Sequence, residues 1–321
     1  MKKVVLSVLL LLVSIGSAFS QFDVQWSQYM FHISSFNPAA VGEGDMIHIT
    51  AQARDQWVGF PNAGKTWLIS ANSPLKIGNS NNGIGLIVLH DQVGQFINQS
   101  AHLQYAYKLK LGAGMLSLGA DLGFVNIGFN KGDSIQDPSH IIPLGDYHDI
   151  ADDPLIPKSS VSGFGFDMNV GAFYSTPTYY AGLSYSHINS PTLTWGDQQK
   201  FKEYGTVYLT GGYNLVMADT RYIFKPSTLV KTDFSSLQWD LTARMEYNNK
   251  YWGGLSYRIQ DAVVFLAGIN LTGGLSVGVS YDLPTSQIIT VSPGSFELLA
   301  MYDLQYIFGT RTSKYKSIRI L

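Results

Sequence analysis

The segment Ser236–Tyr247 reads Ser-Leu-Gln-Trp-Asp-Leu-Thr-Ala-Arg-Met-Glu-Tyr and alternates strictly between two kinds of side chain. The apolar set consists of Leu237, Trp239, Leu241, Ala243, Met245 and Tyr247. The polar set consists of Gln238, Asp240, Thr242, Arg244 and Glu246. Because successive side chains of a β-strand point to opposite faces, this pattern predicts a strand with one apolar and one polar face. Such a strand suits a wall that meets lipid on one side and a wet lumen on the other.

The same alternation recurs in about fourteen short segments between Asp45 and Phe308. The predicted strands span 45–58, 64–75, 83–91, 97–110, 113–130, 161–175, 177–187, 203–217, 220–232, 235–248, 250–260, 261–271, 273–283 and 293–308. After the first twenty residues, no stretch holds the roughly 18 consecutive apolar residues that a membrane helix needs. The sequence therefore predicts an all-β fold, a transmembrane outer-membrane β-barrel of about 14 antiparallel strands.

The composition agrees with a barrel and excludes several other classes. Only 14% of the 321 residues are charged, whereas a soluble domain carries about 25%. A secreted soluble β-sandwich would also alternate, but the low charge and the large number of strands favour the barrel. The net charge of −2 gives no reason to expect nucleic-acid binding. The absence of cysteine excludes disulfides and cysteine-ligated metals.

The first twenty residues predict export. Lys2 and Lys3 precede the apolar run Val4–Val13, and Ala18-Phe19-Ser20 offers small residues for cleavage. We therefore expect four parts: a signal peptide (1–20), a poorly periodic periplasmic or plug segment (21–44), the β-barrel (45–308) and a basic C-terminal tail (309–321). If both termini are periplasmic, the three longest connections (131–160, 188–202 and 284–292) all face the cell exterior, as is typical of bacterial barrels.

Gly59–Thr66 matches the P-loop pattern of nucleotide-binding proteins. That motif binds phosphate only where a strand feeds the loop and a helix leaves it. Here Trp67, Ile69 and Ala71 continue as an alternating strand. We therefore interpret the segment as a strand–turn–strand hairpin.

Other residues that could bind a metal ion or carry catalysis show no supporting sequence pattern. The connection 131–160 concentrates acidic residues and two histidines that could bind a metal ion, but no ligand spacing organises them. They are Asp133, Asp137, Asp146, Asp149, Asp152, Asp153, His140 and His148. His90, His102 and His187 have no local nucleophile signature. We therefore expect no catalytic residue, no cofactor and no metal site, and interpret the acidic connection as a solvated surface loop.

Several charged residues fall on the polar faces of predicted strands, where a barrel lines its lumen. They are Arg54, Asp121, Asp240, Arg244, Glu246, Arg258, Asp282, Glu297 and Asp303. Both signs are present, so these residues fit a blocked, salt-bridged interior and an open channel equally well.

Blocks of sequence along the chain resemble the PorP/SprF family of Bacteroidetes outer-membrane proteins. The most specific are Gln25-Trp26-Ser27-Gln28-Tyr29-Met30-Phe31 with Asn37-Pro38-Ala39, and Arg54-Asp55-Gln56-Trp57-Val58-Gly59. Further blocks are Gly83-Ile84-Gly85-Leu86, Lys225-Pro226-Ser227, Trp252-Gly253-Gly254-Leu255-Ser256-Tyr257-Arg258 and Gly294-Ser295-Phe296-Glu297. The opening motif is spread out by His32–Phe36, and the acidic connection has no counterpart in that pattern.

This resemblance implies a non-enzymatic component of the type IX secretion system or its gliding-motility branch, located in the cell outer membrane. Implied partners are outer-membrane lipid, a periplasmic secretion ring or OmpA-like peptidoglycan-binding protein, and a large secreted adhesin. We expect the chain to support export or surface anchoring of secreted proteins by docking to such partners. The alternative is a passive porin-like channel of the outer membrane.

Overall fold

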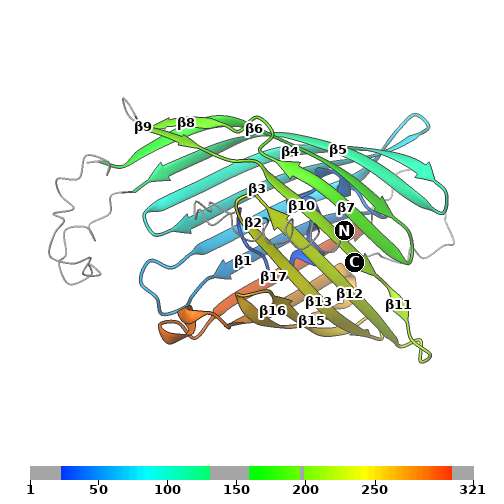
Figure 1. Cartoon of the computed structure of the whole chain (residues 1–321). Helices are drawn as coiled ribbons and strands as arrows, with labels where there is room; N and C mark the ends of the chain where they lie inside the picture. The colour runs from blue at the N-terminus through cyan, green and yellow to red at the C-terminus, as the bar shows by residue number, and fades with distance from the viewer. Residues whose placement is uncertain (1–22, 131–158, 196–198, 306–321) are drawn as a thin grey trace, which may run out of the picture.

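The computed structural model describes residues 23–130, 159–195 and 199–305. Within them, fourteen antiparallel strands close into a barrel, which confirms the predicted fold class (Figure 1). The barrel strands are β1 (Met46–Asp55), β2 (Lys65–Ile77), β3 (Ser80–Val93), β4 (Phe96–Leu111), β5 (Gly114–Phe129), β6 (Val161–Ser175), β7 (Tyr179–Ser186), β10 (Thr206–Tyr213), β12 (Tyr222–Thr232), β13 (Leu237–Tyr247), β14 (Tyr251–Arg258), β15 (Ala262–Asn270), β16 (Leu275–Pro284) and β17 (Ser295–Gln305). β1 and β17 pair along their whole length and close the barrel.

Two details differ from the predicted strands. The predicted strand 203–217 is interrupted at Asn214, so a short β11 (Leu215–Val216) follows β10, and both pair with β12. The predicted loop 188–202 contains a hairpin of β8 (Thr192–Trp195) and β9 (Gln199–Lys202). β8 reads Thr-Leu-Thr-Trp and does alternate, but four residues are the shortest stretch in which alternation indicates a strand.

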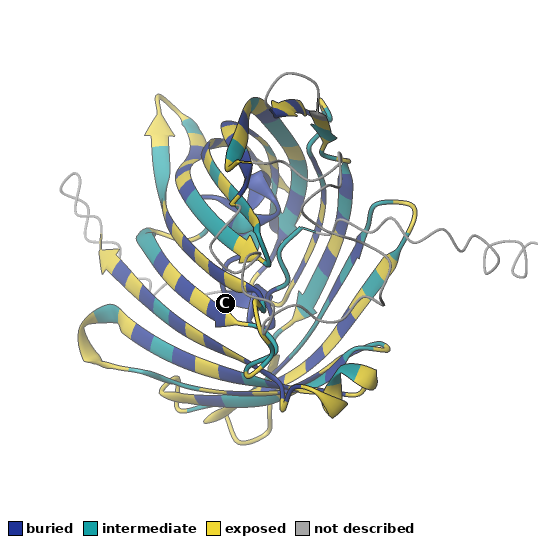
Figure 2. Cartoon of the chain, turned by 90° about the vertical axis from the view of Figure 1, so that its left-hand side faces the viewer, coloured by how far each residue is buried: buried dark blue, intermediate teal, exposed yellow. Residues whose placement is uncertain are grey.

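The alternation predicted for each strand corresponds to an outer and an inner face. On β13, Trp239 and Leu241 are exposed on the outer face while Asp240 and Arg244 are buried on the inner face. The bands of buried and exposed residues repeat along the other strands (Figure 2). An apolar outer face suits contact with lipid hydrocarbon.

The two ends of the barrel differ. One end, here called the loop end, carries the three longest connections, 130–160, 187–205 and 285–294, the last containing η7 (Gln287–Thr290). The opposite end, here called the turn end, carries short connections such as 112–113, 176–178 and 271–274, the last containing η6 (Thr272–Gly274). None of the helices in the described part of the chain has the length and hydrophobicity of a membrane-spanning helix.

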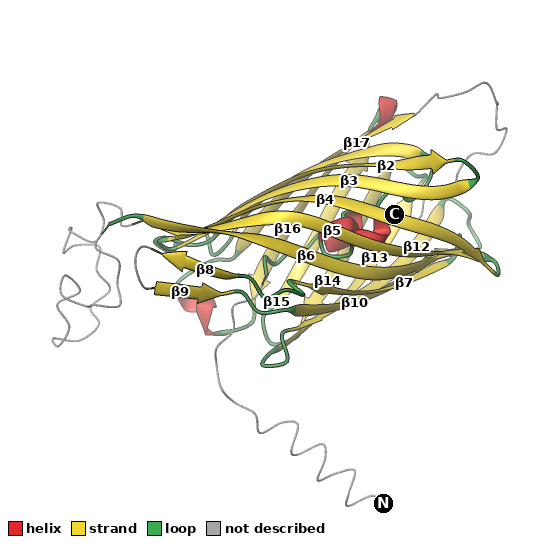
Figure 3. Ribbon diagram, turned by 90° about the horizontal axis from the view of Figure 1, so that it is seen from above, coloured by secondary structure: helices red, strands yellow, loops and turns green. Residues whose placement is uncertain are grey.

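Residues 23–44, here called the inner segment, lie inside the barrel. The segment forms three short 3-10 turns, η1 (Tyr29–Phe31), η2 (Ile33–Ser35) and η3 (Pro38–Ala40), which are visible between the strands in Figure 3. Hydrogen bonds from this segment to β6 and β17 hold it against the inner wall of the barrel.

The P-loop-like segment is a connection between two strands. Lys65 and Thr66 begin β2, Thr66 donates a hydrogen bond to Asp91 at 2.6 Å, and no helix follows. The predicted signal peptide (1–20), the acidic and histidine residues of 133–153, and the predicted tail 309–321 lie outside the described residues.

Candidate functional site

The inner segment runs along the barrel from one end to the other. At the loop end, Asp23 Oδ1 lies 3.1 Å from His187 Nε2, at the end of β7. At the turn end, Glu43 accepts from Lys108 Nζ at 2.5 Å and from Ser175 Oγ at 2.9 Å. The segment is therefore tied to the wall at both of its ends before the chain enters β1.

Local sequence explains the compact turns of the inner segment. Asn37 precedes Pro38 and accepts a hydrogen bond from the Ala39 amide at 3.0 Å, which caps η3. A short polar side chain at the cap and proline at the first helical position are favoured at such a start. Asn37 also donates to the carbonyl of Ala172 on β6 at 3.1 Å, so the cap fixes the segment to the wall.

The wall lacks side chains where the inner segment approaches it most closely. A Cβ atom at Gly119 on β5 would overlap the backbone of Pro38 and Ala39, and one at Gly83 on β3 would overlap the carbonyl of Val41. Glycine at these inward positions lets the two backbones pack directly against each other.

A group of five buried charged residues, here called the charge cluster, contacts the N-terminal half of the inner segment. Its members are Arg54, Asp240, Arg258, Asp282 and Glu297, from β1, β13, β14, β16 and β17. Arg54 reaches Glu297 at 2.6 Å and Asp282 at 2.9 Å. Arg258 reaches Asp282 at 3.0 Å and Asp240 at 3.2 Å.

The inner segment supplies further hydrogen-bond partners of the charge cluster. The backbone amides of Ser27 and Gln28 donate to Glu297 at 2.7 and 3.1 Å. The Ser27 hydroxyl donates to Asp282 at 2.7 Å and accepts from Arg258 Nη2 at 2.8 Å. Buried ions are tolerated only when charges and hydrogen bonds are satisfied, so the cluster and the segment depend on each other.

A second contact lies beside the charge cluster. The Arg244 guanidinium stacks over the Phe31 ring at 4.5 Å, a cation–π contact. Glu246, on the same strand, accepts from Lys225 Nζ at 2.6 Å. The Tyr29 hydroxyl lies 3.1 Å from Ser227 Oγ. Aromatic side chains of the segment are thus held by polar groups of β12 and β13.

Two cavities lie on opposite sides of the inner segment. The outer cavity, of about 390 Å³, opens among Val93, Phe96 and Glu203 at the loop end. The inner cavity, of about 330 Å³, opens among Lys110, Gly114 and Thr176 at the turn end. The segment therefore stands between two chambers of the lumen.

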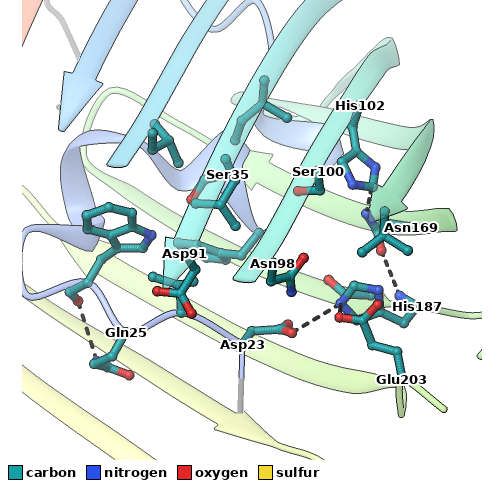
Figure 4. Close-up of a pocket in the computed structure, with 18 of the residues that line it drawn as sticks. Asp23, Gln25, Ser35, Asp91, Asn98, Ser100, His102, Asn169, His187 and Glu203 are labelled. Carbon is teal, nitrogen blue, oxygen red and sulfur yellow. Dashed lines mark hydrogen bonds and ion pairs between the residues drawn. The ribbon is translucent and has the colours of Figure 1, made fainter. Parts of the chain in front are cut away.

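The outer cavity holds a chain of titratable groups (Figure 4). His102 Nδ1 lies 3.1 Å from Asp121 Oδ1, and His187 Nδ1 lies 2.8 Å from Asp167 Oδ2. Burial raises the pKa of Glu203 to about 7. Burial would also raise the pKa of Asp23, but His187 lowers it to about 2, and the same carboxylate helps hold the pKa of His187 well above its ordinary value.

The structure places all nine charged residues predicted on the polar strand faces on the inner face, each at most 7% exposed. Arg54, Asp240, Arg258 and Asp282 belong to the charge cluster, Arg244 and Glu246 lie beside it, and Asp121 lies apart beneath His102. Asp303, on the turn-end side, pairs with His48 at 2.6 Å.

Sequence reasoning missed Asp23, Lys225, Asp167 and Glu203. Asp167 and Asn169 share one face of β6 with Gly163 and Gly165, so their alternation could have revealed Asp167 as an inward charge. Asp23 and Glu203 lie outside the barrel strands, where no periodicity exists to place them.

The family model described as "Type IX secretion system membrane protein PorP/SprF" matches residues 18–302. Among curated proteins, no sequence matches the chain.

Solved structures with a similar fold are outer-membrane barrels. A TodX deltaS2S3 mutant, a monoaromatic hydrocarbon channel, is 11% identical, with a TM-score of 0.50 over 88% of this chain and 95% of that one. The outer membrane protein Omp33 of Acinetobacter baumannii is 8% identical, with a TM-score of 0.47 over 80% of this chain and 97% of that one. At such identities the likeness concerns the fold alone.

Proposed function

Because this chain belongs to the PorP/SprF family of type IX secretion system membrane proteins, we propose that it supports export or surface anchoring of secreted proteins by docking, without conducting or catalysing. It is an outer-membrane barrel of that secretion machinery. The observation that carries the docking proposal is the inner segment, which the charge cluster anchors inside the lumen between the outer and the inner cavity. A lumen filled in this way favours a scaffold over a passive channel.

The loop end is the surface proposed to face the secreted protein. Bacterial barrels place long loops outside the cell. Three apolar side chains of the loop-end connections are exposed: Phe234 by 75%, Val291 by 54% and Ile289 by 50%. Exposed apolar side chains in loops beyond the barrel strands suit contact with a protein partner. We assign this surface to a large secreted adhesin.

The turn end is the surface proposed to face the periplasm. There β11 and β12 form a hairpin that projects at the lower right of Figure 1. Leu215, Val216 and Met217 on this hairpin are exposed by 42%, 62% and 45%. We assign the hairpin to a periplasmic ring or OmpA-like peptidoglycan-binding partner. This partner would belong to the type IX secretion system or to its gliding-motility branch.

Gene deletion tests the proposal. Loss of the chain should remove a specific protein from the cell surface, and re-expression of the wild type should restore it. A surface proteome unchanged by the deletion would contradict a role in export or anchoring.

Two point variants test the two surfaces, and each serves as the control for the other. Phe234→Asp should reduce recovery of the secreted protein in affinity purifications while periplasmic partners are retained. Val216→Asp should have the opposite effect. Equal recovery of all partners with both variants would contradict the assignment of the two ends.

A further inference from the structure

We propose that Asp23, His187 and Glu203 form a binding site for a divalent transition-metal ion of the Zn²⁺ class at the loop end of the lumen. The site does not depend on the proposed role in secretion. Its three residues come from the inner segment, the end of β7 and the connection between β9 and β10. They lie together on one side of the outer cavity (Figure 4).

The ligand atoms are already close to coordination geometry. One atom from each residue lies within 4.8 Å of the others. His187 Nε2 is 3.1 Å from Asp23 Oδ1 and 3.8 Å from Glu203 Oε1. Two ligands of a tetrahedral zinc ion lie about 3.3 Å apart, given metal–ligand bonds of about 2.0–2.2 Å. Small side-chain shifts would therefore complete three protein ligands and leave a fourth position open.

The surroundings of these atoms are those of a metal site. Asp167, fully buried, lies 2.8 Å from the second ring nitrogen of His187. The contact is an ion pair that lacks hydrogen-bond alignment. A small rotation of the ring would let Asp167 accept the Nδ1 proton, as a carboxylate does beside a metal-bound imidazole. The second oxygen of Asp23 accepts a hydrogen bond from the Tyr208 hydroxyl. Glu203 Oε2 is buried and has no hydrogen-bond partner among the described residues, so it is available to an ion.

The backbone of His187 is held in an unusual conformation. Its φ of 55° lies in the left-handed region, which costs energy for a residue with a side chain. The side chain of Asn169 accepts from the His187 amide at 2.7 Å, and the following amide donates to Met168 at 3.0 Å. These contacts hold the imidazole toward Asp23 and Glu203.

Charge and ligand type favour a transition metal. Three carboxylates, Asp23, Asp167 and Glu203, surround His187, while Lys231 donates to the Asp23 carbonyl at 2.9 Å. A divalent ion that replaces the proton on His187 Nε2 balances this charge. Imidazole with two carboxylates suits zinc, whereas calcium prefers six to eight oxygen ligands. A bound ion would fix the loop-end part of the inner segment to the barrel wall.

Zinc binding to the intact barrel tests the site. The full chain, purified in detergent and stripped with chelator, is titrated with Zn²⁺ by calorimetry. Wild type should bind one ion saturably. Glu203→Gln preserves the side-chain shape and should weaken binding at least as much as Asp167→Asn does. Asp167→Asn should weaken it by about 10–100-fold. The control His90→Ala, at the loop end of β3 outside the cluster, should bind as wild type.

Folding of each variant is checked by heat-modifiable migration on gels, so that lost binding is not confused with a lost fold. His187→Ala should abolish binding, and if that variant fails to fold, the shape-preserving Glu203→Gln carries the test. Absence of saturable Zn²⁺ binding to wild type would overturn the site, as would unchanged binding by folded Glu203→Gln.

Discussion

Arg54 and Glu297 face each other across the seam where the first and last strands meet, with Arg54 Nη1 2.6 Å from Glu297 Oε1. The same Glu297 accepts hydrogen bonds from the backbone amides of Ser27 and Gln28. Closure of the barrel and capture of the inner segment therefore share one carboxylate. A change that disturbs either is expected to disturb both, because buried charges left without partners are costly.

Arg258→Ala should destabilise the barrel strongly. Arg258 is 1% exposed and contacts Asp240, Asp282 and Ser27. Removing one partner of a buried ion network costs about 3–5 kcal/mol. Urea unfolding in micelles, followed by tryptophan fluorescence, measures the loss.

Arg221→Ala is the matched control for Arg258→Ala. Its pair with Asp219 is well exposed, so the expected loss is small, because exposed ion pairs contribute little to stability. Losses of similar size for the two arginines would contradict a structural role for the charge cluster.

Gly119→Val should displace the inner segment while the barrel persists. The added side chain would overlap Pro38 and Ala39, and overpacking of this kind costs about 1–3 kcal/mol. Limited proteolysis should then cut within residues 23–44, while migration on gels stays heat-modifiable.

Gly253→Val is the control for that experiment. Gly253 lies on the outer face of β14, and its nearest neighbour, the Leu266 carbonyl, would be 3.5 Å from the new Cβ. The segment should stay protected in this variant. Equal protection in both variants would mean that Gly119 does not position the segment.

In mild acid, protonation of His32 in the inner segment should lower the folding stability of the protein. Burial lowers the pKa of His32 from 6.5 to about 4. The unfolded state then binds a proton that the folded state excludes, so this contribution to stability is full above about pH 6.5 and falls as the pH drops toward 4. At pH 5 the loss should reach about 2 kcal/mol.

Unfolding at pH 8 and pH 5 measures the His32 effect. His32→Gln should reduce the difference between the two pH values by about that amount, since glutamine does not titrate. His90→Gln, at a partly exposed position of β3, is the control. A pH dependence unchanged by His32→Gln would contradict the assignment.

The strands could be predicted from sequence because a barrel wall between lipid and lumen imposes a period of two on every strand. That period placed Asp240 and Arg258 on the inner face, but it could not pair them with Ser27. The inner segment follows 3-10 turns set by Asn37 and Pro38, which leave no regular pattern.

The proximity of the titratable residues in the outer cavity could not be predicted from the sequence, for a different reason. Asp23 and His187 are 164 residues apart and meet only because the barrel closes around the inner segment. Glu203 was predicted as the first residue of the strand 203–217, but in the structure it lies in the connection between β9 and β10. Proximity of such groups is a property of the closed barrel and not of any local stretch.

Single-channel recording in planar lipid bilayers tests the plugged scaffold most directly. Wild-type protein should show no stable large conductance, because the inner segment stands between the two cavities. A variant lacking residues 23–41, with heat-modifiable migration confirming its barrel, should conduct in large, stable steps. A wild-type conductance as large as that of the deletion variant would contradict the account and favour a passive channel.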